Sequence, residues 1–144
     1  MRKKSLVVLA LTVLVALAAT SVHAQTFTVR ANIPFDFYAG SSAMPAGEYT
    51  FDTLMGHGIG HIWSADSIRN VTVLFQPSML PSGFDGGSAS LVFHRYDKTY
   101  FLSEVRNGVE SADCVIPASS SELKIQKSAS LRGPDEEVVV LARR

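Results

Sequence analysis

Hydrophobic and polar residues alternate along three segments of the chain, 27–33, 49–53 and 71–75. Alternation with a period of two is typical of antiparallel strands that have one buried face. The β-branched and aromatic residues in these segments favour the same structure. The side chains expected to point toward the core are Phe27, Val29, Ala31, Ile33, Tyr49, Phe51, Thr53, Val71, Val73 and Phe75.

Glycine and proline residues separate the predicted strands. Pro34 ends the first strand, and Pro45 with Gly47 is typical of a tight turn. Asn107-Gly108 is a dipeptide that is common in hairpins. Strand segments recur about every ten residues, a spacing typical of sandwiches and barrels. The sequence therefore predicts an all-β fold, a single antiparallel β-sandwich or small β-barrel of about eight strands.

Segment 119–131 departs from this pattern. Ser119 and Glu122 have the spacing of a capping box, which predicts one short helix near 119–127. Apolar residues at odd positions between 123 and 131 would also suit a strand, so both structures remain open and the helix is favoured. A final strand is predicted at 138–142.

The segment LVFHRYDKTYFLSEV, residues 91–105, predicts a hairpin. A two-residue turn at Asp97-Lys98 defines the pairs across it, which are Tyr96–Thr99, Arg95–Tyr100, His94–Phe101 and Phe93–Leu102. One face would carry Leu91, Phe93, Arg95, Tyr100, Leu102 and Glu104, and the other Val92, His94, Tyr96, Thr99, Phe101, Ser103 and Val105. Because both faces are largely apolar, we expect a central hairpin with both sides partly covered.

Two interpretations of this hairpin follow. In the first, which is favoured, the hairpin is structural, and Arg95 lies over the Tyr100 ring while its guanidinium pairs with Glu104. In the second, His94, Arg95 and Tyr96 form the rim of a ligand pocket.

The stretch IPFDFYAGSSAMPAGEYTF and the hairpin together resemble a family of small secreted proteins abundant in soil acidobacteria. Members carry a PF-x-F…G…PAG-x-Y segment, a FHRY-x-x-x-YFL hairpin and a late E-x-x-L stretch, and the resemblance covers most of residues 27–131. The family has no established activity, so the resemblance implies a fold family and a secreted location rather than a catalytic role. The matching residues are Pro34, Phe35, Phe37, Gly40, Pro45, Ala46, Gly47, Tyr49, Phe93, His94, Arg95, Tyr96, Tyr100, Phe101 and Leu102.

The first residues have the layout of a secretory signal peptide, with a cationic start, an apolar run at 6–19 and a small side chain at Ala24. The run of about 14 residues is shorter than the stretch of about 20 that a membrane span needs. We expect cleavage between Ala24 and Gln25, secretion across the inner membrane and a periplasmic or extracellular location. Residues 1–24 are then a signal peptide, and residues 25–144 form one secreted β-domain without a stable membrane span.

Charge and cysteine content exclude further classes of function. Removing residues 1–24 takes Arg2, Lys3 and Lys4 from the 13 basic residues and leaves all 13 acidic ones, so the formal net charge is 10 minus 13, or −3. Such a domain is not expected to bind nucleic acid, which requires a basic surface. Cys114 is the only cysteine, so no internal disulfide forms. We expect a small buried side chain, with a reactive thiol or an intermolecular disulfide as alternatives.

Histidines and the single tryptophan are the remaining candidates for chemistry. In an extended strand His57 and His61 would lie about 13 Å apart, too far for one metal ion. In a tight loop they could converge, and His94 could add a third ligand. Surface-loop histidines are favoured, and no metal site is predicted. Trp63 is expected in the core, with a sugar-stacking platform as the alternative.

No catalytic motif is present. The chain lacks G-x-S-x-G, a P-loop and a dinucleotide fingerprint, and the carboxylates at 135–137 are interpreted as solvated charge. The sequence predicts a secreted, non-enzymatic binding or interaction module with no cofactor and an unidentified envelope or extracellular partner. The alternatives are a structural component of the cell envelope and a metal- or thiol-dependent enzyme that uses His57, His61, His94 or Cys114.

Overall fold

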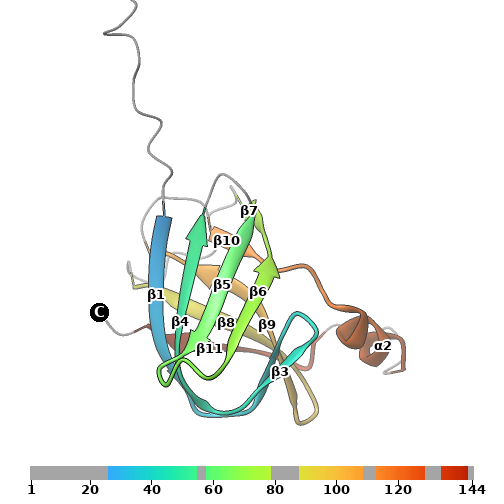
Figure 1. Ribbon diagram of the computed structural model, residues 1–144. Helices are drawn as coiled ribbons and strands as arrows, with labels where there is room; N and C mark the ends of the chain where they lie inside the picture. Colours follow the sequence, from blue (N-terminus) through green and yellow to red (C-terminus); the bar gives the residue numbers. More distant parts are fainter. Residues whose placement is uncertain (1–25, 55–57, 79–87, 109–112, 129–133, 143–144) are drawn as a thin grey trace, which may run out of the picture.

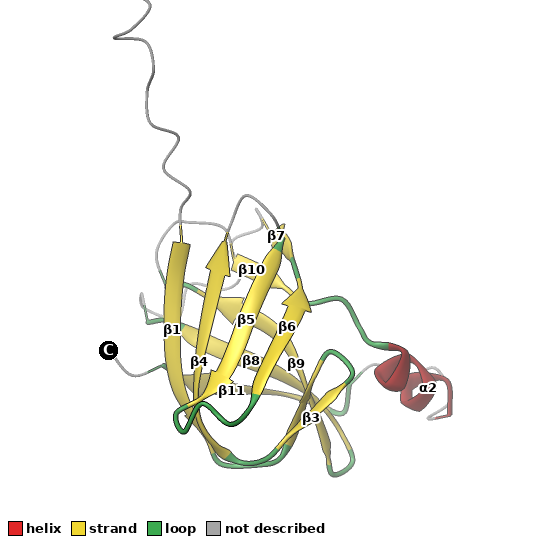
Figure 2. Ribbon diagram, in the orientation of Figure 1, coloured by secondary structure: helices red, strands yellow, loops and turns green. Residues whose placement is uncertain are grey.

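The structure is a computed structural model that describes residues 26–54, 58–78, 88–108, 113–128 and 134–142. In these ranges, eleven strands form two sheets, and one helix lies to their side (Figures 1 and 2). The predicted signal peptide and its cleavage site between Ala24 and Gln25 lie outside the described residues.

The four-stranded sheet nearest the viewer in Figure 1, the front sheet, has the order β1-β4-β5-β6 and is antiparallel throughout. Its strands are β1 Thr26–Ile33, β4 Gly47–Leu54, β5 Ile59–Ser64 and β6 Asn70–Leu74. The predicted alternation is confirmed here, because the expected inward positions of β1, β4 and β6 are buried or packed against the core.

The seven-stranded back sheet has the order β11-β8-β9-β10-β7, and β2 adds to β9 as a parallel neighbour. Its strands are β2 Phe37–Ala39, β3 Ser42–Met44, β7 Gln76–Ser78, β8 Ser90–Tyr96, β9 Thr99–Arg106, β10 Asp113–Val115 and β11 Glu136–Leu141. Four of these strands have only three residues, which is too short to produce a recognisable alternation. The described chain therefore has more strands than the eight expected, while the all-β prediction is confirmed.

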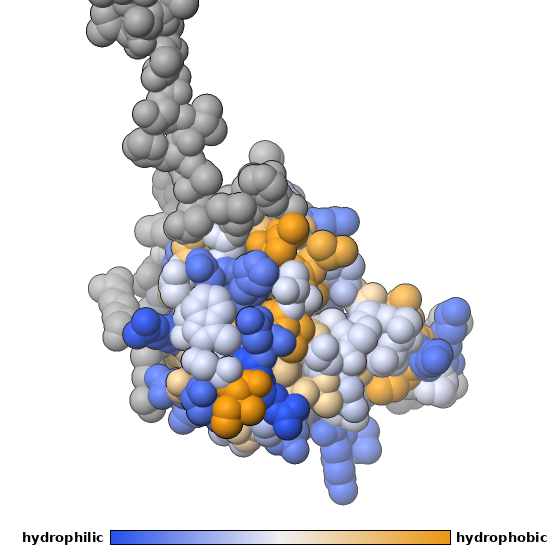
Figure 3. All heavy atoms as spheres, in the orientation of Figure 1, coloured by the Kyte–Doolittle hydropathy of each residue, from blue (hydrophilic) through white to orange (hydrophobic). Residues whose placement is uncertain are grey.

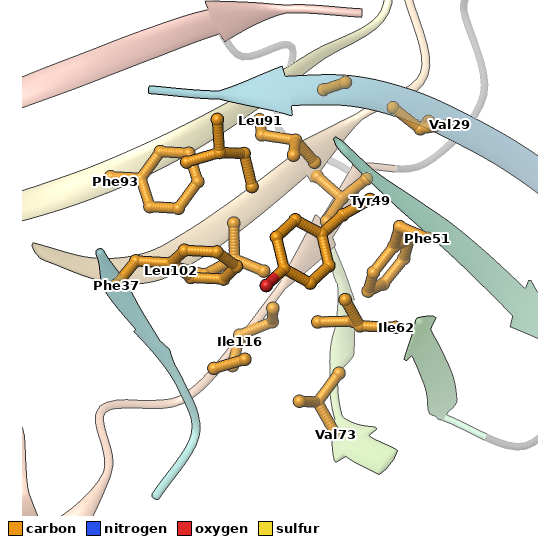
Figure 4. Packing of buried hydrophobic residues seen from close by; sticks show 14 of the residues in the cluster. Val29, Phe37, Tyr49, Phe51, Ile62, Val73, Leu91, Phe93, Leu102 and Ile116 are labelled. Atoms are coloured by element: carbon orange, nitrogen blue, oxygen red, sulfur yellow. The ribbon is translucent and has the colours of Figure 1, made fainter. Parts of the chain in front are cut away.

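One hydrophobic core lies between the sheets (Figure 4). Side chains from both sheets point toward one another there, with Phe51 and Ile62 from the front sheet opposite Phe93 and Leu102 from the back sheet. The labelled residues in this view are Val29, Phe37, Tyr49, Phe51, Ile62, Val73, Leu91, Phe93, Leu102 and Ile116. Cys114 belongs to the same cluster, so the prediction that it is a small buried side chain is confirmed.

The predicted hairpin is formed by β8 and β9, and all four predicted pairs are confirmed. It is central in the back sheet, as expected. The expected division of its faces holds in β8 and in β9 as far as Leu102, and it is wrong after Leu102, because the register shifts between Val92 and Phe93 and leaves Ser103 as an extra residue in β9. Leu91 then pairs with Val105, and both side chains enter the core.

The expected contact of Arg95 with Glu104 is also wrong. Arg95 Nη2 lies 2.8 Å from Glu136 Oε2, and Glu104 Oε2 lies 2.9 Å from Arg106 Nε. The register explains the change, since β11 places Glu136 directly beside Arg95. The bulge meanwhile pairs Glu104 with Val92 and turns its side chain to the other face of the hairpin. The carboxylate of Glu136, interpreted as solvated, is therefore in an ion pair.

The predicted helix is α2, Ser120–Ser128. Its N-cap is Ser119, whose Oγ accepts a hydrogen bond from the Glu122 amide at 3.2 Å and whose carbonyl accepts one from the Leu123 amide at 2.9 Å. The helix prediction is confirmed and the strand alternative is wrong. Within the described ranges, no helix combines the length and apolar character that a membrane crossing requires.

Candidate functional site

The residues singled out in the sequence lie on opposite outer faces of the two sheets. Trp63 and His61 belong to β5 in the front sheet, whereas His94 and Tyr96 belong to β8 in the back sheet. The hydrophobic core separates the two groups. His61 and His94 therefore do not converge on one metal ion, and His57 lies outside the described residues.

Trp63 faces outward, so the expectation that it belongs to the core is wrong. Its neighbours in the strand, Ile62 and Ser64, are buried and point inward, while Trp63 is partly exposed on the opposite face. The inner face at this point is already filled by Phe51 and Ile62. The alternation of the strand predicts this orientation. Residues two apart in a strand share a face, so Trp63 lies on the same face as His61, whose polar side chain indicates the outer face.

Two rows of side chains cross the outer face of the front sheet. Strand register aligns the first row across β1, β4, β5 and β6 as Arg30, Thr50, Trp63 and Asn70. The second row, two residues along each strand, consists of Thr28, Asp52, His61 and Thr72. We call these eight residues the Trp63 face.

Hydrogen bonds order the second row of the Trp63 face. Thr28 Oγ1 donates to Asp52 Oδ1 at 3.3 Å, and Thr72 Oγ1 lies 3.2 Å from His61 Nδ1. His61 is thus on an exposed strand position rather than in the expected surface loop. Among the described residues, no side-chain hydrogen bond links Arg30, Thr50, Trp63 and Asn70 of the first row to one another.

Most of the surface over the front sheet is hydrophilic or neutral, with hydrophobic side chains gathered near β6 (Figure 3). Leu74 contributes to this apolar part, since 70% of it is exposed. The charged groups on the face itself are Arg30 and Asp52, with Glu48 one row further along β4. Opposite charges are interspersed, so the face presents no strong field of either sign.

Hollows border this face where β6 begins. One of about 320 Å³ is lined by residues of β3 and by Ile68, Arg69 and Asn70. A second, of about 400 Å³, runs along the turn before β6 and shares Ile68 and Arg69. Arg69 also lines a third hollow of about 370 Å³. The Trp63 face therefore continues past Asn70 into an indented rim.

The other group of predicted residues meets α2 in a buried polar cluster. Glu122 Oε1 lies 3.0 Å from His94 Nδ1 and accepts a hydrogen bond from the Tyr96 hydroxyl at 3.1 Å. Gln126 Nε2 donates to the same hydroxyl at 2.6 Å. Glu122 is only 3% exposed. We call these four residues the Glu122 cluster, and they fasten α2 to the outer face of the back sheet.

Electrostatics of the Glu122 cluster follow from burial and pairing. The hydrogen bond to Glu122 raises the pKa of His94, against the opposing effect of partial burial. Glu137 and Glu104 face the same imidazole from β11 and β9 and raise its pKa further. Burial raises the pKa of Tyr96, so the phenol stays a neutral donor at physiological pH.

The sequence identified two of the four residues of the Glu122 cluster as site candidates. His94 and Tyr96 were candidate rim residues, but Glu122 was recognised only as part of a capping box and Gln126 was missed. Their spacing of four residues on a helix, which places both on one face, was the available signal. The carboxylate is buried and its Oε1 has two partners in the back sheet, so the cluster has the character of a structural tether.

In the described residues, neither the candidate thiol nor the candidate metal ligands are arranged for catalysis. Cys114 is 0% exposed, and burial raises its pKa to about 12, which keeps the thiol protonated at physiological pH. Among the residues that the structure describes, no group of three or more histidine, cysteine, aspartate or glutamate side chains could hold a metal ion. Arg95, the remaining rim candidate, is engaged by Glu136.

No protein-family model, curated protein or solved structure matches the chain. The resemblance to small secreted acidobacterial proteins therefore stays a prediction.

Proposed function

We propose that this protein is a secreted, non-enzymatic binding module of the periplasm or cell exterior, and that the Trp63 face is its binding surface. The outward position of Trp63 is the observation that carries this proposal. Burying an indole in the core gains hydrophobic free energy, whereas the indole of Trp63 on the outer face keeps part of its surface in solvent. Aromatic side chains on a surface are enriched where proteins bind partners.

The surroundings of Trp63 support the same role. A rigid antiparallel sheet holds the indole at a fixed place between β4 and β6. Sites on strands are positioned more accurately than sites on loops. In the second polar group, the Glu122 cluster, the carboxylate is buried and already accepts hydrogen bonds from the protein itself.

Capture from native envelope tests the proposal. The secreted protein is purified, its first residue is sequenced, and immobilised wild type is compared with Trp63→Ala in capturing envelope material. We expect Gln25 at the N-terminus and loss of capture in Trp63→Ala. Leu123→Ala, which alters an exposed apolar residue on α2, is the control and should capture as wild type does. Capture that is unchanged by Trp63→Ala would refute the Trp63 face as the binding surface.

A further inference from the structure

The indole of Trp63 is partly exposed on the outer face, and its lateral neighbours are small. Thr50 and Asn70 flank it on the adjacent strands, and neither is long enough to cover the ring. No described element lies over the outer face of the front sheet (Figure 1). An exposed aromatic ring attracts C–H groups through dispersion and through its negative π face. Such a ring suits a ligand with a flat C–H surface.

Hydrogen-bonding groups of both kinds extend from the indole across the sheet. Arg30 can only donate, Asp52 can only accept, and Asn70 can do both. The row from Arg30 to Asn70 crosses four strands and spans about 14 Å, given a strand spacing of about 4.8 Å. A ligand rich in hydroxyl groups can donate and accept along such a row. The length of the row fits a chain better than a single small molecule.

Charge on the face selects against ionic ligands. Arg30 is balanced by Asp52 and Glu48, so neither a polyanion nor a polycation meets a complementary surface. The ligand that combines flat C–H faces, many hydroxyls and no charge is a neutral polysaccharide. A β-1,4-linked chain of pyranoses is a flat ribbon that suits a sheet, whereas an α-1,4-linked chain coils away from one.

We infer that the Trp63 face binds an uncharged, extended β-1,4-linked polysaccharide outside the cell, with one pyranose ring stacked on Trp63. Asn70, Thr50 and Arg30 would bond the hydroxyls of the stacked ring and of its neighbours. This inference rests on the proposed function and names the ligand class of the same surface.

Titration with cellohexaose tests the ligand class directly. Trp63 is the only tryptophan, so intrinsic fluorescence reports the environment of this one ring. We expect cellohexaose at millimolar concentration to shift the emission in a saturable way and to release heat in calorimetry. Maltohexaose, with the same sugar in α-1,4 linkage, is the matched control and should do neither. Equal binding of the two hexaoses would overturn the inference.

Variants at two positions connect the binding to the face. By calorimetry, Trp63→Ala should weaken cellohexaose binding by about tenfold or more, while Trp63→Phe should retain part of the affinity. Asn70→Ala changes an exposed residue that contributes nothing to the core, so its effect cannot be attributed to unfolding. It should weaken binding while leaving the thermal midpoint as in wild type. Binding that both Trp63→Ala and Asn70→Ala leave unchanged would refute the site.

The outcomes separate this inference from the proposed function. If neither hexaose binds and envelope capture still depends on Trp63, the polysaccharide is wrong and the binding face stands. If envelope capture also does not depend on Trp63, both the polysaccharide ligand and the binding face are wrong.

Discussion

At the scale of single residues, Phe93 is the centre of the core. It is 0% exposed, and its ring meets Phe35 and Phe37 edge-on at centroid distances of 5.2 Å and 5.4 Å. Phe93→Ala should lower the free energy of unfolding by about 3–5 kcal/mol, a large part of the about 5–15 kcal/mol typical of a domain. Denaturant midpoints measure this effect. Leu74→Ala, at a position 70% exposed, is the control and should change little.

Gly60 in β5 has no room for a side chain. A Cβ added there would lie 2.7 Å from Cζ of Phe51, whose ring is held in the core. Gly60→Ala should therefore destabilise the fold by about 1–3 kcal/mol through overpacking. Gly47→Ala is matched to it, because its Cβ would meet Tyr49 Cε2 at 3.6 Å, an ordinary contact. Equal thermal midpoints for the two variants would contradict this reading of the β5 backbone.

The residue scale also shows where sequence reasoning fails. The burial of Cys114 was predictable, because a single cysteine between apolar neighbours usually behaves as a small buried hydrophobic side chain. Trp63 was assigned to the core from its size, although its parity with His61 pointed to the outer face. Glu122 was placed in the right helix, but its partners His94 and Tyr96 come from a strand about thirty residues earlier, which no local pattern reveals.

At the scale of elements, α2 is held to the back sheet by His94, whose pKa is raised by its hydrogen bond to Glu122. Because Glu122, Glu137 and Glu104 all face His94 and its folded pKa is raised, the protonated form stabilises the fold. This stabilisation is complete below the unfolded pKa of about 6.5 and is lost as pH rises through the folded value. Wild type should therefore lose stability relative to His94→Gln as the pH rises from about 6.5 through the raised folded pKa of His94.

Urea unfolding of both proteins across this pH range measures the difference. Glu122→Gln removes the main partner of His94 and should flatten most of the pH dependence that distinguishes wild type from His94→Gln. A constant difference between wild type and His94→Gln at every pH would show that the pair does not tether α2.

Elements with a long alternating pattern were the predictable ones. The core-facing positions of β1 and β4 follow from their alternation, and the register of β8 with β9 near the turn follows from the two-residue turn at Asp97 and Lys98. The bulge at Ser103 could not be predicted, since one extra residue in a strand leaves the composition of the segment unchanged. That shift moves Val105 into the core and Glu104 to the face opposite Arg95, and the register of β11 supplies Glu136 as the partner of Arg95.

At the scale of the whole molecule, the two sheets share one core and are expected to unfold together. The accessibility of the Cys114 thiol can report on this joint unfolding of the two sheets. It lies in β10 of the back sheet, pairs in register with Val105, and its thiol faces Thr53 of the front sheet. A reagent can reach the sulfur only when the sheets separate, and the raised pKa of about 12 leaves little reactive thiolate in the folded state.

We therefore expect a thiol reagent such as Ellman's reagent to leave the native protein unmodified and to label Cys114 only as the fold opens. Across a denaturant series, the labelled fraction should rise with the same midpoint as the loss of the β-sheet circular dichroism signal, because a single core unfolds in one cooperative step. Leu102→Ala, which removes a core side chain that is 4% exposed, should move both midpoints to lower denaturant by the same amount. Labelling of the native protein within minutes would mean that the thiol is accessible, and it would return the thiol-dependent enzyme to consideration.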